Sequence, residues 1–224
     1  MVNEAHMPHV PDTLNSRQDL MGDKVKPIPQ ALVIGVGGVG SYIAVCLAMT
    51  GTKDIMLVDP DIVEESNRNR VLFRYFDTGI EKVNAMESIL TQLRRDINVV
   101  SRRCRVEDLG KEDKEFVSKS VVFDCRDSVE PLPDWVPRCI ATGGYDGTVV
   151  SLHTNPDLRK VFTSDVVRYT ITPSYCVPPM LIASLVTLYA TCPELQSEKE
   201  RISTFDIRTM FDKIFDKNMQ VHND

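Results

Sequence analysis

A short apolar run that leads directly into a cluster of glycines constrains the fold of this chain more than any other feature. Residues 31–34 read Ala-Leu-Val-Ile, and the turn 35–40 and the apolar segment 41–49 follow at once. The glycines of the turn are Gly35, Gly37, Gly38 and Gly40. A short, wholly apolar run is typical of a strand buried on both faces, and the longer segment is typical of a buried helix. The sequence therefore predicts a strand, a tight turn and a helix.

The same alternation continues along the chain. Residues 54–59 form a second apolar strand that ends in Asp59, and apolar residues recur at helical spacing between positions 83 and 93. Two further strands and an intervening charged helix are expected at residues 98–106, 121–124 and 110–119. Alternating strands and helices favour a parallel sheet covered on both faces. We therefore expect an α/β fold with a Rossmann-like, doubly wound, mainly parallel sheet.

The C-terminal third departs from this alternation. Strand-like runs at residues 149–153 and 169–172 precede a helix expected at 180–190, which predicts a few antiparallel C-terminal strands. We divide the chain into a flexible, proline-containing arm at 1–29, one domain at 30–193 and a helical tail at 194–224. The tail carries an apolar stripe at helical spacing, formed by Ile207, Met210, Phe211, Ile214 and Phe215. Such a stripe packs on its own domain or binds a partner.

Composition excludes several classes of function. The chain has 224 residues and a net charge of -6, which fits one soluble domain and argues against nucleic-acid binding. No apolar stretch reaches the length of a membrane span and no signal peptide is visible, so a cytoplasmic protein is expected. None of the six cysteines forms a CxxC pair, so neither a zinc site nor a thioredoxin-like motif is expected.

The glycine turn predicts a nucleotide site. Such a turn lets the backbone approach phosphates and directs the N–H groups of the following helix at their charge. Asp59 lies 19 residues beyond Gly40, where an acid at the end of the second strand can accept hydrogen bonds from a ribose. NAD, FAD, S-adenosylmethionine and ATP are all held by such turns, so these features alone leave a dehydrogenase as the default.

A polar cluster after the second strand favours ATP. Asp59 is followed by Asp61, by Ser66 and Asn67, and by Arg70 three residues further on. This segment resembles the ThiF/MoeB family of activating enzymes. The resemblance extends to Lys82 at the start of the next helix and to Asp127 at the end of the 124–127 DxxD segment. The resemblance covers residues 31–127 and is weaker at the glycine-rich segment 143–147.

The resemblance implies that the chain adenylates the C-terminal carboxylate of a ubiquitin-like or sulfur-carrier protein, or of a peptide, with ATP and Mg²⁺. That reaction joins two anions, so cations and a metal are needed to stabilise the charge. By resemblance, Arg70 and Lys82 would hold the phosphates with help from Asn67, and Asp127 would bind magnesium. Asp59 would bind ribose, and the glycines and Asp61 complete the expected nucleotide site.

Each of these side chains also has a purely structural interpretation. An arginine in a polar loop or a lysine that opens a helix is usually a solvated charge, and Asp127 could form a turn after its strand. Arg17 faintly resembles an arginine that some relatives extend to a partner's ATP, but a mobile surface charge fits it better. Cys176 and Cys192 lack an acyl-accepting motif and are expected to be buried structural thiols.

The expected partners are a small ubiquitin-like or sulfur-carrier protein and, as in most relatives, a second copy of the chain in a homodimer. Two other functions stay open at this point. An NAD-dependent oxidoreductase is supported by the glycine turn and Asp59 alone, and it lacks a recognisable catalytic His or Tyr-x-x-x-Lys arrangement. A non-catalytic scaffold subunit of an activating enzyme would keep the fold but would not need the phosphate-binding and metal-binding residues.

Overall fold

The computed structural model describes residues 13–128, 130–156 and 174–210, and its main feature is a parallel sheet of four strands. The strands lie in the order β3-β2-β1-β4, with β1 at Gln30–Ile34, β2 at Asp54–Val58, β3 at Asn98–Arg102 and β4 at Val121–Asp124. Ala31 of β1 pairs with Ile55 on one side and with Val121 on the other. All three strand pairings are parallel, which confirms the predicted sheet.

Helices cover both faces of this sheet because its central strands are apolar on both sides. Ala31 and Val33 face a core shared with α2 (Gly38–Thr50), α3 (Lys82–Leu93) and α5 (Val177–Thr191). Leu32 and Ile34 face a second core beneath α4 (Lys111–Ser118). Successive side chains of a strand point to opposite faces, so an unbroken apolar run needs a cover on each. The doubly wound arrangement is confirmed.

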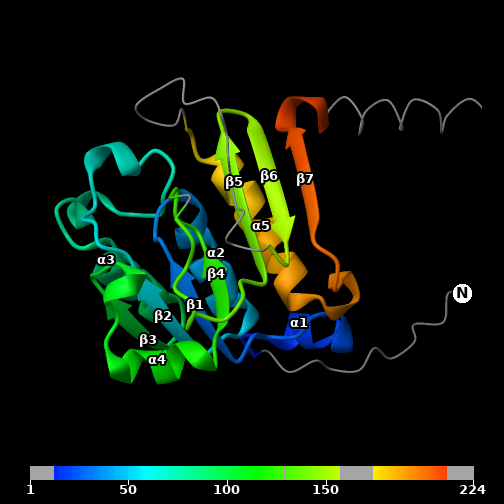
Figure 1. Ribbon diagram of the computed structural model, residues 1–224, viewed down its shortest axis with the longest axis horizontal. Coiled ribbons are helices and arrows are strands. Elements are labelled where there is room, and N and C mark those ends of the chain that lie inside the picture. The colour runs from blue at the N-terminus through cyan, green and yellow to red at the C-terminus, as the bar shows by residue number, and fades with distance from the viewer. Residues whose placement is uncertain (1–12, 129, 157–173, 211–224) are drawn as a thin grey trace, which may run out of the picture.

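A separate antiparallel sheet stands beside the parallel one (Figure 1). It consists of β5 (Ala141–Asp146), β6 (Val149–Thr154) and β7 (Arg201–Asp206) in that order. The β5 side approaches the parallel sheet: the Thr142 hydroxyl donates to the Asp124 carbonyl at 2.5 Å, and the Ile140 N–H donates to the Val122 carbonyl at 3.2 Å. Helix α5 packs against β5, β6 and α2 and so joins the two halves into one core.

The sequence predicted only part of this second sheet. Strand β6 and helix α5 were expected and β5 was not, and the helical tail was wrong for residues 201–206, which form β7. The tail becomes helical at residue 207. The strand expected at 169–172 and the end of the apolar stripe from Phe211 onward lie outside the described residues.

The N-terminal segment folds back onto the domain from residue 13 onward. It contains α1 (Ser16–Asp19) and a 3₁₀ turn at Gly22–Lys24. The Gln18 amide donates to the Thr50 carbonyl at 2.8 Å, the Lys26 N–H donates to the Thr191 carbonyl at 2.7 Å, and Ile28 is buried. These contacts differ from the flexible arm that the prolines predict. The division into domains stays a prediction.

The remaining described elements are short 3₁₀ helices. Four 3₁₀ helices connect the larger elements, at Glu65–Asn67, Tyr75–Asp77, Val106–Asp108 and Pro193–Leu195. Within the described ranges, no helix combines the length and the apolar character that a bilayer crossing requires.

Candidate functional site

The strand order of the parallel sheet reverses between β1 and β4. The chain leaves β1 toward β2 on one side and returns to β4 on the other, and ligands of open α/β sheets bind where the order reverses in this way. The glycine turn follows β1, Asp59 follows β2 and Asp127 follows β4. All three therefore lie at the carboxyl edge of the sheet.

The glycine turn is packed tightly on one side and open on the other. A Cβ on Gly40 would lie 1.8 Å from the Gly35 carbonyl oxygen, and one on Gly35 would lie 2.9 Å from the Cys125 carbonyl oxygen. Gly35 also has a φ of 86°, which favours glycine. In contrast, a Cβ on Gly37 would meet nothing within 4 Å.

Helix α2 begins beside this open side with uncapped N–H groups. It starts at Gly38, and its N-cap Gly37 supplies no side-chain hydrogen bond. The first N–H groups of a helix lack partners inside the helix, and together with the helix dipole they attract anions. The turn can therefore hold a phosphate against the first turn of α2.

Asp59 ties the glycine turn to the second strand. Its carboxylate is buried and accepts the Val36 N–H at 2.6 Å and the Asp61 N–H at 2.9 Å. Burial raises the pKa of Asp59, while the Lys82 ammonium 3.9 Å away and the two N–H donors oppose that rise. Both carboxylate oxygens thus have structural partners, and binding of a ribose by this side chain stays a prediction.

Lys82 lies beside Asp59 but pairs with a second acid. It is the first residue of α3, its side chain is largely buried, and its ammonium donates to Asp61 at 2.7 Å. The Asp61 carboxylate is far more exposed than its partner. An incoming phosphate would therefore find the lysine ammonium already in place, held by an acid at the surface.

The polar loop after β2 holds Arg70 in a different way. The buried Asn67 accepts the Glu64 N–H through its side-chain oxygen at 3.1 Å and so caps the 3₁₀ turn. The Arg70 guanidinium donates through Nη1 to the Ser66 carbonyl at 2.7 Å and to Asn69 Oδ1 at 3.2 Å. Among the described residues no carboxylate pairs with Arg70, so its charge is available to an anion.

Asp127 is exposed and is not needed for the turn after β4. Asp124 accepts the Arg126 N–H at 3.2 Å, and the Ser128 hydroxyl accepts the Glu130 N–H at 3.1 Å. These bonds perform the turn-forming role that Asp127 might otherwise have. In the part of the chain that the structure describes, the Asp127 carboxylate has no hydrogen-bond or ion-pair partner.

A magnesium ion could use this carboxylate only together with substrate oxygens. Within residues 13–128, 130–156 and 174–210, no group of three or more His, Cys, Asp or Glu side chains could hold a metal. Mg²⁺ in nucleotide enzymes is commonly bound by one or two carboxylates plus phosphate oxygens and water. Asp127 offers one exposed carboxylate, which is compatible with that pattern.

Tyr145 reaches the glycine turn from the second sheet and was not identified from the sequence. A Cβ on Gly38 would lie 2.6 Å from its hydroxyl oxygen. Tyr145 lies on β5, within the segment 143–147 that resembles the family only weakly, and its approach to the glycine turn was not predicted. The glycines of the 143–147 segment were the sequence signal that could have indicated close packing here. In the structure, Gly143 leaves no room for a Cβ beside Ile182 on α5.

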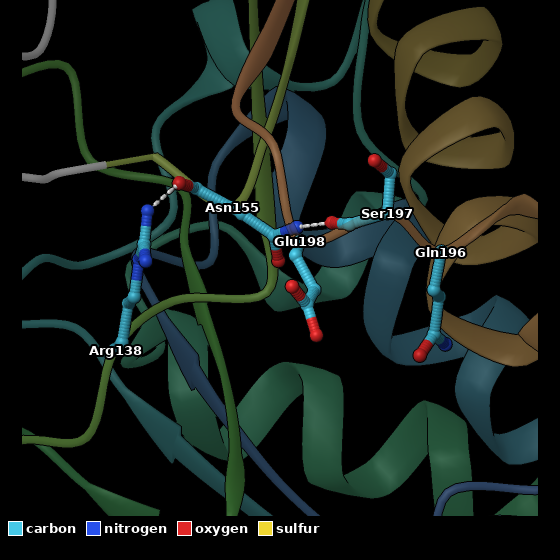
Figure 2. A pocket seen from close by; sticks show the side chains of 5 residues that line it. All are labelled: Arg138, Asn155, Gln196, Ser197 and Glu198. Carbon is cyan, nitrogen blue, oxygen red and sulfur yellow. Dashed lines mark hydrogen bonds between the residues drawn. The ribbon is translucent and has the colours of Figure 1, made fainter.

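A cavity of about 410 Å³ lies elsewhere, at the open end of the β5–β6 hairpin (Figure 2). It is lined by Arg138, Asn155, Gln196, Ser197 and Glu198. Arg138 donates to the Asn155 carbonyl, and the Asn155 amide donates to the Ser197 carbonyl and to the Tyr189 hydroxyl. None of the predicted site residues lines this cavity, whereas Tyr145 lies near the turn of the same hairpin.

The cysteines differ more in exposure than the sequence suggested. Cys192 is buried as expected, but the expectation was wrong for Cys176, which is exposed because α5 begins directly after it and leaves it as the N-cap. Burial raises the pKa of the Cys139 thiol to about 12 and that of the Cys125 thiol well above its usual value. Cys176 is therefore the accessible thiol of these four.

Comparison with known proteins identifies the family of this chain. The ThiF family model matches residues 22–154, which is more than half of the chain. The structure of *E. coli* MccB with ATP is 18% identical, covers 89% of this chain and 73% of that one, and superposes with a TM-score of 0.61. At that identity the likeness concerns the fold, and it confirms the Rossmann-like architecture.

Two curated relatives each match about half of the chain. The sulfur carrier protein ThiS adenylyltransferase of *Escherichia coli* (strain K12) is 34% identical over 114 residues, which are 50% of this chain and 45% of the relative. The NEDD8-activating enzyme E1 catalytic subunit of *Caenorhabditis elegans* is 34% identical over 106 residues, 47% of this chain and 24% of the relative. The chain thus spans less than half the length of these relatives.

We predict opposite effects for two Gly→Ala substitutions in the turn. Gly40→Ala should lower the free energy of unfolding by about 3 kcal/mol, because the methyl group would collide with a main-chain carbonyl. Gly37→Ala should leave stability within about 1 kcal/mol of the wild type, since its methyl group enters open space. Urea unfolding followed by circular dichroism measures both. Equal losses in the two variants would contradict the described packing.

We also predict the order in which the thiols react. In the native protein Cys176 should be alkylated by iodoacetamide before Cys125, Cys139 and Cys192, because it is exposed and reaction requires an accessible thiolate. Cys139 should react only after unfolding, since its raised pKa leaves almost no thiolate at pH 8. Peptide mass spectrometry after timed labelling measures this order. Early labelling of Cys139 would contradict its described burial.

Proposed function

The chain belongs to the ThiF family, and from that premise we propose that it adenylates the C-terminal carboxylate of a small ubiquitin-like or sulfur-carrier protein, or of a peptide. The observation that carries this proposal is the group of available charges at the carboxyl edge of the sheet. The open turn at Gly37 follows β1, and Arg70 lies on the loop after β2 with no carboxylate partner among the described residues. Asp127 follows β4, and its carboxylate has no partner among the described residues either. The relative named as an adenylyltransferase supports ATP as the donor.

The reaction needs positioning and charge neutralisation more than proton transfer. A carboxylate oxygen of the substrate forms a bond to the α-phosphorus of ATP, the bond to the β-phosphate oxygen breaks, and pyrophosphate leaves with that electron pair. The product is an acyl-adenylate. An ionised carboxylate needs no general base, so the protein contributes mainly by holding two anions together. No cysteine has to take the acyl group for this step.

Arg70 and Lys82 would neutralise the phosphates. Arg70 has no carboxylate partner among the described residues, and its fork of donors suits phosphate oxygens. Lys82 would exchange its bond to the exposed Asp61 for a bond to phosphate. Asn67 would act by holding the loop that carries Arg70, and Asp59 would add a bond to the ribose beside its structural ones.

Magnesium would be held by Asp127 and by oxygens of the nucleotide. The ion would offset the negative charge that develops on pyrophosphate. Asp127 can contribute because its carboxylate is exposed and the turn bonds after β4 are made by Asp124 and Ser128. We expect this reaction to take place in the cytoplasm.

We predict that Arg70→Ala weakens the binding of Mg–ATP by about 10- to 100-fold, the range expected for hydrogen bonds to a charged group. Isothermal titration calorimetry with the full chain measures the affinity without knowledge of the carrier protein. Arg138→Ala is the matched control, because Arg138 contacts main-chain carbonyls at the other cavity and should leave the affinity unchanged.

Two outcomes would reject the proposed site. If Arg138→Ala weakened ATP binding and Arg70→Ala did not, the nucleotide would occupy the cavity of Figure 2. If the protein bound NAD with an affinity indifferent to Arg70, an oxidoreductase would replace the adenylation proposal. ATP–pyrophosphate exchange with a matched carrier protein and magnesium then tests the reaction itself.

We further propose that the chain forms a homodimer through the loop between β2 and α3. Tyr75 and Phe76 are 78% and 65% exposed on this loop, and Leu72 and Ile80 are also exposed. The Arg74 guanidinium lies 4.5 Å from the centre of the Phe76 ring, which fixes that ring at the surface. Exposed clusters of aromatic side chains are typical of interfaces.

We predict that the double substitution Tyr75→Ser and Phe76→Ser converts the dimer to a monomer, because it removes the two most exposed rings of the patch. Light scattering after size-exclusion chromatography measures the mass. The control is Leu14→Ser with Leu20→Ser, which removes two side chains that are each 69% exposed at the N-terminal segment. A monomeric wild type, or a dimer that persists in the aromatic variant, would contradict this interface.

A further inference from the structure

The Tyr145 hydroxyl lies beside the glycine turn, and the proposed function gives it no role. It extends from β5 in the second sheet and lies against Gly38, the first residue of α2. Pro179 in the first turn of α5 lies on the same glycine, with 3.2 Å between its Cβ and a Cβ built on Gly38. The second sheet and α5 therefore meet the parallel sheet at the point where α2 presents its uncapped N–H groups.

Among the described residues, the Tyr145 hydroxyl accepts one hydrogen bond and donates none. The Ser174 hydroxyl donates to the Tyr145 oxygen at 3.2 Å, so that oxygen already acts as an acceptor. Within residues 13–128, 130–156 and 174–210, no acceptor is found for the Tyr145 O–H. The ring is held by packing against the core of α2 and α5, so the hydroxyl does not swing freely.

The same hydrogen bonds link Tyr145 to the arginine of the polar loop. The Ser174 carbonyl accepts the Asn69 amide at 3.0 Å, and the Asn69 side-chain oxygen accepts the Arg70 guanidinium at 3.2 Å. Asn69 thereby connects the loop after β2 with the residue that positions Tyr145. One chain of hydrogen bonds thus links the Arg70 guanidinium to the Tyr145 hydroxyl.

We propose that the Tyr145 hydroxyl donates a hydrogen bond to the nucleotide phosphate that lies closest to α2, and that Ser174 is the positioning residue for this contact. A neutral donor suits this place because α2 already supplies positive dipole charge, and a phenol adds a directed bond without a long flexible side chain. The inference rests on the proposed function, since it assumes that a nucleotide phosphate occupies the glycine turn.

Calorimetry with three probes, Mg–ATP, AMP and adenosine, tests the contact. Tyr145→Phe keeps the packed ring and should weaken Mg–ATP and AMP by at least about tenfold, while adenosine, which has no phosphate, should bind as it does to the wild type. Tyr189→Phe is the matched control, because that hydroxyl bonds to Asn155 and Ser197 at the other end of the second sheet. It should leave all three affinities unchanged.

Ser174 is tested with a double-mutant cycle. Ser174→Ala should weaken AMP binding several-fold in the wild type and should have no further effect in the Tyr145→Phe background, since it acts through that hydroxyl. Ser174→Thr, which keeps a hydroxyl, should restore the affinity. Additive losses in the cycle would overturn the positioning role of Ser174.

The remaining outcomes separate this inference from the proposed function. Unchanged affinities in Tyr145→Phe together with a weakened Arg70→Ala would overturn the Tyr145 contact and keep the adenylation site. An equal loss for adenosine and AMP would show that Tyr145 supports the fold and would overturn the contact. A wild type that binds neither Mg–ATP nor AMP would overturn the proposed function and this inference together.

Discussion

One buried carboxylate sets the geometry of the candidate site. Asp59 accepts main-chain N–H groups from the glycine turn and from its own loop, so it fixes the ends of β1 and β2 relative to each other. A buried charge is costly unless hydrogen bonds and a counter-charge compensate it, and here two N–H donors and Lys82 do so. Without this carboxylate, two N–H groups, one of them buried, would lose their acceptor. The conformation of the open turn at Gly37 therefore depends on Asp59, although the sequence motif assigns this side chain only to binding of the ribose.

The two cations of the site are held by different physical means. Lys82 sits at the start of α3 between two acids, and the more exposed of them, Asp61, makes the short bond. Arg70 is held instead by a carbonyl and an amide oxygen, which orient the guanidinium without neutralising it. The chain as a whole carries a net charge of -6. An arginine without a carboxylate partner nevertheless attracts anions locally at the candidate site.

The sequence predicted those parts of the structure that short-range patterns determine. The runs at β1 and β2 are apolar after their first residue, and the glycine turn follows β1 directly, so strand, turn and helix could be placed in the correct order. Strand β5 could not be predicted in this way, because its glycines and polar residues form a strand only through pairing with β6 and packing on Ile182. Strand β7 is mostly exposed and also depends on β6 for its hydrogen bonds.

The residues of the site show the same limit. Arg70 and Asp127 were identified because two short segments, 59–70 and 124–127, resemble the motifs of the ThiF/MoeB family, and their roles stay predictions. Tyr145 lies more than a hundred residues beyond Gly38, and only the approach of β5 to β4, through Thr142 and Asp124, brings its hydroxyl to the first turn of α2. The candidate site takes hydrogen-bond donors from both sheets. A sequence motif that lies within one sheet does not predict a donor that the other sheet provides.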